Sequence, residues 1–162
     1  SGADEIFANA ELGNADFVCS QTAQTGVLRR MIWLDREGPI AYLEPFKERL
    51  LARRVTRFDE NNWWKWGRRH FVSDAPRIYV NQKTRRPRPF FLNDCRNYDG
   101  AILALFPHRR DAGLEGLRDL LNDVDWAELG FVCDGRFLFA QRSLAQALLP
   151  EDFAPFATRA LV

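Results

Sequence analysis

Apolar residues along this chain occur in short runs and in one longer stretch with helical spacing. Residues 27–34 (VLRRMIWL) predict an early strand, because β-branched and aromatic side chains favour extended structure. Over residues 40–57 the apolar positions return every three or four residues, which predicts a helix with one apolar stripe. Gly38-Pro39 fits the first turn of this helix, and Pro45 inside the stripe is the alternative start.

Three further runs predict strands in the middle of the chain, at residues 76–81, 90–92 and 101–106. The last run (AILALF) is apolar throughout, so we expect this strand to be buried on both faces. Residues 82–89 (QKTRRPRP) predict a loop, because two prolines and four cations oppose both helix and sheet.

The C-terminal part predicts a helix, a hairpin and a last short helix. Residues 114–121 have the apolar spacing of a helix. Asp134-Gly135 between apolar runs predicts a type I′ hairpin turn, and Ser143 predicts the N-cap of a helix through Leu149. Strands and helices that mix without strict alternation predict the α+β class, with a mixed or antiparallel sheet and a few helices.

Length and composition are those of an ordinary globular protein. The chain has 162 residues, of which 46% are hydrophobic and 28% charged, so we expect a single domain over residues 1–162. The sequence contains no apolar run long enough to predict a membrane span. The first residues lack the basic and apolar regions of a secretory leader, so a cytoplasmic location is expected. The missing initial Met suggests a processed chain or an excised fragment.

The three cysteines, Cys19, Cys95 and Cys133, lie far apart and form no Cys-x-x-Cys pair. This spacing predicts neither a zinc site nor a disulfide framework. Reduced thiols in a cytoplasmic protein are the simpler interpretation.

The net charge is +1, but the charge is unevenly distributed along the chain. Residues 47–96 carry 14 Lys or Arg against 5 Asp or Glu, whereas there are 3 basic and 7 acidic residues before them and 6 and 10 after them. A basic middle between acidic flanks is expected when one face binds a polyanion. A solvated basic face with scattered ion pairs is the alternative.

The motifs of familiar enzymes are missing from the sequence. Neither histidine, His70 or His108, lies near a Gly-x-Ser-x-Gly nucleophile motif, and phosphate-binding glycine loops are absent. Asp94 and Asp99 flank Cys95 and form a candidate carboxylate pair on spacing alone. The chain therefore does not have the features of a complete enzyme. His70, which follows two arginines, suits a phosphate or base contact.

Two basic stretches, at residues 61–71 and 82–89, favour nucleic acid as the polyanion. The second carries its cations on a loop stiffened by prolines, where they must face solvent or a ligand. Arginine offers a fork that matches guanine, lysine a point charge for phosphate or guanine, and amide side chains match adenine. The cations of this loop are Lys83, Arg85, Arg86 and Arg88, and the amides beside the two stretches are Asn61, Asn62, Asn81 and Gln82.

Residues 61–71 (NNWWKWGRRHF) combine three tryptophans with a basic run. Exposed adjacent indoles are costly, so at least one of Trp63, Trp64 and Trp66 is expected to anchor this segment in the core. Trp33 and Trp126 are expected to be core residues. Base stacking by all three clustered tryptophans, as in single-strand binding proteins, is the alternative.

Several segments, taken in order, resemble the C-terminal target-recognition domain of restriction–modification N6-adenine DNA methyltransferases. SGADEIF at residues 1–7 resembles the stretch just beyond the catalytic domain of that family. AYLEPFKERLLARR at residues 41–54, and the NWWKWGR that follows, resemble its helix and basic segment. LLN at residues 120–122, GRFLFAQ at 135–141 and LLP at 148–150 resemble its closing elements.

The resemblance implies a DNA-binding, bacterial-type domain that recognises a defined site in double-stranded DNA beside an N-terminal catalytic methyltransferase domain. The Asn/Asp-Pro-Pro-Tyr/Phe motif and the glycine-rich S-adenosylmethionine site of that family do not occur in this chain. We therefore expect no cofactor here, and S-adenosylmethionine only in the full-length adenine-specific enzyme. Expected phosphate contacts are Arg53, Arg54, Arg57, Lys65, Arg68 and Arg69. Expected base-reading residues are Asn81, Gln82, Lys83, Thr84, Arg85, Arg86 and Arg88.

Two other functions fit the same sequence. One is an RNA-binding or single-strand-binding module, in which the tryptophans stack on bases. The other is a protein-interaction domain whose basic face meets an acidic partner. No membrane is expected as a partner in any of the three interpretations.

Overall fold

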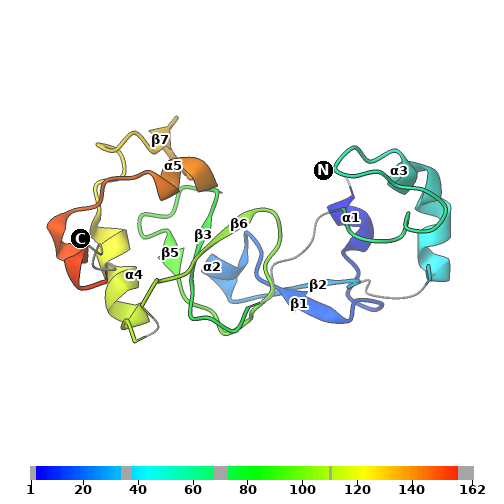
Figure 1. The fold of residues 1–162 in the computed structure, drawn as a ribbon, viewed down its shortest axis with the longest axis horizontal. Coiled ribbons are helices and arrows are strands. Elements are labelled where there is room, and N and C mark those ends of the chain that lie inside the picture. Colours follow the sequence, from blue (N-terminus) through cyan, green and yellow to red (C-terminus); the bar gives the residue numbers. More distant parts are fainter. Residues whose placement is uncertain (1–2, 34–37, 68–72, 110, 157–162) are drawn as a thin grey trace, which may run out of the picture. The chain divides into compact units, whose positions relative to one another are not determined.

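The computed structural model describes residues 3–33, 38–67, 73–109 and 111–156 (Figure 1). Contacts within the chain group the residues into two compact units. Unit 1 is formed by Ser1–Phe17 and Arg29–Val72, and unit 2 by Val18–Leu28 and Ser73–Val162. The chain therefore passes between the units three times.

The described residues of unit 1 form one strand pair and three short helical segments. β1 (Ala15–Phe17) pairs antiparallel with β2 (Arg29–Met31), and Phe17 lies opposite Arg29. The helical segments are α1 (Asp4–Phe7), the 3₁₀ helix η1 (Ala41–Phe46) and α3 (Lys47–Leu51). Pro45 lies inside η1, and the α-helix begins two residues after it, because a proline lacks the N–H that an α-helical interior needs.

Aromatic side chains build the core of unit 1. Phe17 is fully buried, and its ring stacks on that of Trp66 with centroids 5.4 Å apart. Trp63 and Trp64 are also buried and meet edge to face at 5.9 Å. Trp66 donates its indole N–H to the carbonyl oxygen of Ile32 at 2.9 Å. The prediction that this segment is anchored in the core by tryptophan is confirmed.

Unit 2 contains two three-stranded antiparallel sheets, with strand orders β5-β3-β6 and β4-β8-β7. The strands are β3 (Ile78–Asn81), β4 (Lys83–Thr84), β5 (Phe90–Phe91), β6 (Ile102–Leu105), β7 (Val132–Cys133) and β8 (Arg136–Leu138). β3 is buried at every position. Ile78 and Val80 belong to one apolar cluster and Tyr79 to another, so both faces of this strand are covered.

Helices and one loop complete unit 2. The helices are α2 (Thr22–Thr25), α4 (Leu114–Asp123), α5 (Gln141–Ala145) and the 3₁₀ helix η2 (Glu151–Phe156). The loop of residues 18–28 carries α2 and is held by Val18, which is fully buried and forms a parallel bridge with Tyr98. Trp126 is buried and donates its indole N–H to the carbonyl oxygen of Leu121 at 2.7 Å.

The antiparallel pairing and the few short helices confirm the predicted α+β class. The predicted type I′ hairpin is also confirmed, because Asp134 and Gly135 have φ angles of 52° and 71° and connect β7 to β8. The prediction of a single domain over residues 1–162 stays a prediction.

Four local predictions are wrong. The helix predicted over residues 40–57 ends at Leu51, because the Arg53 side chain donates to the carbonyl of Leu50 at 2.8 Å and occupies an acceptor at the helix end. In the predicted loop, Lys83–Thr84 forms β4, because β8 supplies a partner strand. β6 lies at a sheet edge, so only its first residue is fully covered. Ser143 lies inside α5 rather than at its N-cap.

The close approach of Gly13 to the backbone of β2 makes it sensitive to substitution. A Cβ atom there would lie 2.5 Å from the Asn9 carbonyl oxygen and 3.0 Å from the Met31 nitrogen. We expect Gly13→Ala to lower the free energy of unfolding by about 1–3 kcal/mol in a urea titration. Gly116→Ala in α4 is the control, because a Cβ there meets nothing within 4 Å and alanine favours helix. Equal loss in both variants would contradict this explanation.

Candidate nucleic-acid interface

The expected phosphate contacts and base-reading residues fall in different units. Those expected to contact phosphate lie in unit 1, and those expected to read bases lie in unit 2. Arg68, Arg69 and His70 lie outside the described residues. The remaining cations differ in what they contact, and that difference decides which of them can meet a ligand.

Arg53 acts inside unit 1. Its guanidinium donates to the carbonyl oxygens of Trp63 (2.7 Å) and Lys65 (2.9 Å) and lies 3.8 Å from the ring centroid of Phe58. Burial lowers the pKa of Arg53 to about 10, so the side chain is still protonated at neutral pH. Arg53 therefore connects the end of α3 to the tryptophan segment, and few of its donors remain for an external phosphate.

Arg54, Arg57 and Lys65 have the opposite character. All three are exposed, and within the described part of the chain none of them forms an ion pair. Lys47 offers a contrast, since it pairs with Glu60 at 2.6 Å and that hydrogen bond raises the pKa of Lys47. Among the described residues of unit 1, these three exposed side chains are therefore available to a polyanion.

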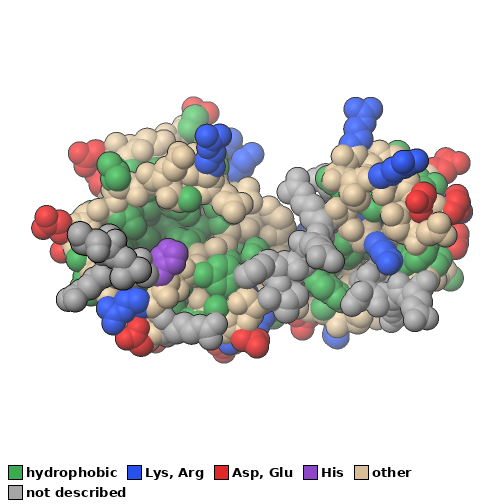
Figure 2. All heavy atoms as spheres, viewed as in Figure 1, with side chains coloured by type: hydrophobic (Ala, Val, Ile, Leu, Met, Phe, Trp, Pro, Cys, Tyr) green, Lys and Arg blue, Asp and Glu red, His purple; other side chains and the backbone are tan. Residues whose placement is uncertain are grey.

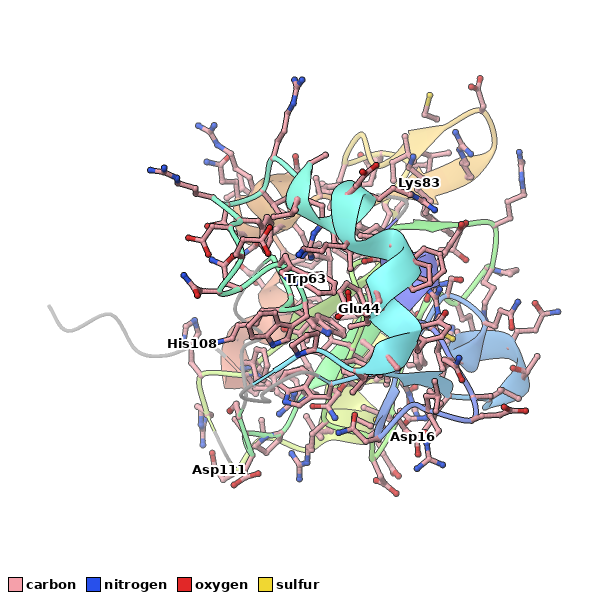
Figure 3. All side chains as sticks on the ribbon, turned by 90° about the vertical axis from the view of Figure 1, so that its right-hand side faces the viewer. Asp16, Glu44, Trp63, Lys83, His108 and Asp111 are labelled. Atoms are coloured by element: carbon pink, nitrogen blue, oxygen red, sulfur yellow. The ribbon has the colours of Figure 1, made fainter. Side chains whose placement is uncertain are left out.

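The clustered tryptophans leave little indole surface for stacking on bases. Trp63 (labelled in Figure 3) and Trp64 are buried. Lys47 lies over the ring of Trp63, 5.5 Å from its centroid. The ring of Trp66 already contacts those of Phe17, Phe7 and Trp33. Packing within unit 1 is therefore the main role of all three indoles.

In unit 2 the two predicted amides lie at the end of β3 and just beyond it. Asn81 is buried and donates its side-chain N–H to the carbonyl oxygen of Ser20 at 2.7 Å, while its Oδ1 has no hydrogen-bond partner among the residues that the structure describes. Gln82 donates to the carbonyl oxygen of Gly100 at 2.8 Å. Both amides thus bind backbone carbonyls of neighbouring loops, and neither side chain is fully exposed.

Two of the four cations beyond these amides are committed to contacts inside unit 2. Arg88 forms ion pairs with Asp123 at 2.9 Å and Asp119 at 3.9 Å, which connect it to α4. Arg86 is half-buried and donates to the carbonyl oxygen of Ala23 in α2. The partners of these arginines come from segments far apart in the sequence. The run KTRRPR alone therefore did not indicate which arginines form contacts inside the unit.

Lys83 and Arg85 are the exposed cations of this stretch. Lys83 lies on β4 and forms no ion pair with a described residue, and Thr84 beside it accepts a hydrogen bond from the Arg86 backbone N–H. The guanidinium of Arg85 donates to the carbonyl oxygen of Asp134 at 3.1 Å, at the hairpin turn. Neither cation is paired with a carboxylate of a described residue.

Two further arginines, one buried and one exposed, were not among the predicted site residues. Arg77 is buried and donates to the carbonyl oxygens of Ala75, Arg96 and Ser73, so it fixes a loop of unit 2. Arg136 is exposed on β8, in the sheet that contains Lys83. The hairpin itself was predicted, but nothing in the sequence signalled that β4 pairs with it and sets Arg136 near the basic stretch.

The described residues contain no group of three His, Cys, Asp or Glu side chains that could hold a metal ion. Among the helices that the structure describes, none is both long and apolar enough to cross a membrane. Comparisons with protein-family models, with curated proteins and with solved structures find no match for this chain.

The contacts of Arg53 generate a stability prediction. Arg53→Lys keeps the charge but loses the planar fork, so a single ammonium nitrogen replaces the two guanidinium nitrogens that now reach three carbonyl oxygens. We expect the free energy of unfolding to fall by about 2 kcal/mol, measured by urea titration with tryptophan fluorescence. Arg54→Lys is the matched control, because that neighbour is exposed and should change the value by less than about 0.5 kcal/mol. Identical midpoints for the two variants would refute the role of Arg53.

Proposed function

We propose that this chain recognises a defined sequence in double-stranded DNA, as the specificity domain of a site-specific adenine-N6 DNA methyltransferase of a restriction–modification system. The observation that carries the proposal is that several of the predicted contact residues are exposed cations without a carboxylate partner among the described residues. These cations are Arg54, Arg57 and Lys65 in unit 1, and Lys83 and Arg85 in unit 2. We leave Arg53 of unit 1 and Arg88 of unit 2 out of the proposed contacts, because their guanidiniums are already engaged.

Unpaired surface cations suit the phosphate backbone for a thermodynamic reason. A cation that meets a phosphate releases condensed counterions from the duplex, and this release favours binding at low salt. A cation already paired with a carboxylate gives up that pair on binding, so its gain is smaller. Such contacts orient a protein on the duplex, while contacts to base edges provide specificity.

The methyltransferase part of the proposal rests on the order of the sequence segments that resemble that family. In this proposal the transfer reaction, with its S-adenosylmethionine, belongs to a separate catalytic domain. Lifting an adenine out of the duplex costs a few kcal/mol of stacking and pairing energy. Binding energy gained by the recognition domain elsewhere on the site would offset that cost.

The packing of the tryptophans favours duplex recognition over single-strand or RNA binding. Stacking of successive bases needs indole faces open to solvent, and Trp63 and Trp64 are buried. A protein-interaction domain with a basic face would instead bind an acidic protein rather than a nucleic acid. Competition with a duplex, a single strand, an RNA hairpin and poly-glutamate separates the three. Preference for one duplex sequence supports the proposal, whereas equal binding to all four would remove it.

The unpaired cations of unit 1 give a prediction for salt dependence. The double variant Arg54→Ala, Arg57→Ala should weaken binding to every duplex sequence alike, because phosphate contacts are independent of sequence. The slope of log K against log salt should become shallower by about 1.8, since each phosphate contact contributes about 0.9. Fluorescence anisotropy of a labelled duplex at several KCl concentrations measures both quantities.

Lys47→Ala is the matched control for that experiment. It removes one positive charge from the same unit, but that charge is already paired with Glu60. Its slope should stay close to that of the unmodified chain. If the control and the double variant changed the slope equally, general charge rather than these contacts would explain the binding.

A further inference from the structure

The sheet β4-β8-β7 brings together cations from two distant parts of the sequence. Lys83 pairs with Leu138, and Thr84 with Phe137. One residue further, the same register sets Arg85 at the level of Arg136. Figure 3 shows Lys83 beside the gold hairpin of β7 and β8, and Figure 2 shows Lys and Arg side chains gathered beside that hairpin.

The hairpin turn holds one of these cations in place. The Arg85 guanidinium lies 3.1 Å from the carbonyl oxygen of Asp134 and 3.5 Å from that of Gly135. The turn presents these carbonyls because both of its residues have positive φ. One guanidinium nitrogen of Arg85, Nη1, thus faces both backbone carbonyls. The N–H groups on the other two nitrogens remain for a ligand.

The continued register sets two of these cations at facing positions, Arg85 and Arg136, with Lys83 two residues before Arg85 on the same segment. All three side chains are exposed, and like charges directly opposite each other on a strand pair repel. The carboxylate of Asp134 is the only acidic side chain of the sheet and its turn, and it forms no ion pair with a described residue. A phosphate oxyanion at this position would relieve the repulsion and accept hydrogen bonds from the arginine forks.

We propose that Lys83, Arg85 and Arg136 form one phosphate-binding site, which takes a backbone phosphate of duplex DNA. The inference rests on the proposed function for its choice of duplex as the source of the phosphate. It also changes the role expected of Lys83 and Arg85, which become positioning contacts rather than base readers. Arg136 acts with them, and the carbonyl oxygens of the hairpin turn orient Arg85.

The test compares Arg136→Ala with Arg118→Ala in the full 162-residue chain. Arg118 is also in unit 2, but it lies on α4 and pairs with Asp119 at 3.0 Å. With a labelled duplex of random sequence, Arg136→Ala should make the salt slope shallower by about 0.9, and Arg118→Ala should leave it unchanged. The loss of affinity should be the same for all duplex sequences. A loss confined to one sequence would overturn the phosphate role.

A second probe separates this site from the proposed function. Inorganic tripolyphosphate, titrated against the labelled chain, should shift the backbone amide NMR signals of residues 83–85 and 133–137, and Arg136→Ala should abolish those shifts. If tripolyphosphate binds there but no duplex does, the phosphate site stands while the duplex and the proposed function fall. Shifts by poly-glutamate but not by tripolyphosphate would overturn the site, as would no response to any of these probes.

Discussion

Burial of β3 on both faces is the constraint on which unit 2 depends. Its alternating side chains enter two different apolar clusters, with Ile78 and Val80 on one side and Tyr79 on the other. A strand covered in this way cannot slip by one residue without moving every side chain to the wrong cluster. The register of β3 is therefore fixed. Because β4 begins two residues after β3 ends, the basic stretch also has a defined position on the surface of unit 2.

The arginines of this protein perform two kinds of work, which their sequence context does not separate. Arg53 and Arg77 donate to backbone carbonyls at several points and organise loops that have little regular structure. Others, such as Arg54 and Arg136, have exposed side chains with no ion pair among the described residues. Some arginines of this protein therefore hold loops together, and others form a basic surface. Only the contacts of each guanidinium distinguish the two groups.

Local patterns predicted the elements whose cause is local. The apolar run at β3, the Asp134-Gly135 turn and the helix α4 were all evident in the sequence, because turn chemistry and periodicity act over a few residues. The pairing of β4 with β8 and the engagement of Arg88 by α4 depend on residues far along the chain. The candidate site was accordingly predicted as a stretch of sequence, while the division between occupied and exposed cations needed the fold.

The loop of residues 18–28 has a consequence for how the chain is made. Its two ends are joined by the pairing of Phe17 with Arg29, two segments that are both made early. Its own partners come much later, since Ser20 accepts a hydrogen bond from Asn81, 61 positions further along. On a ribosome this loop therefore emerges well before the strands that will hold it. Completion of unit 2 must wait for the second half of the chain, whereas the β1–β2 pair can form as soon as Met31 has left the tunnel.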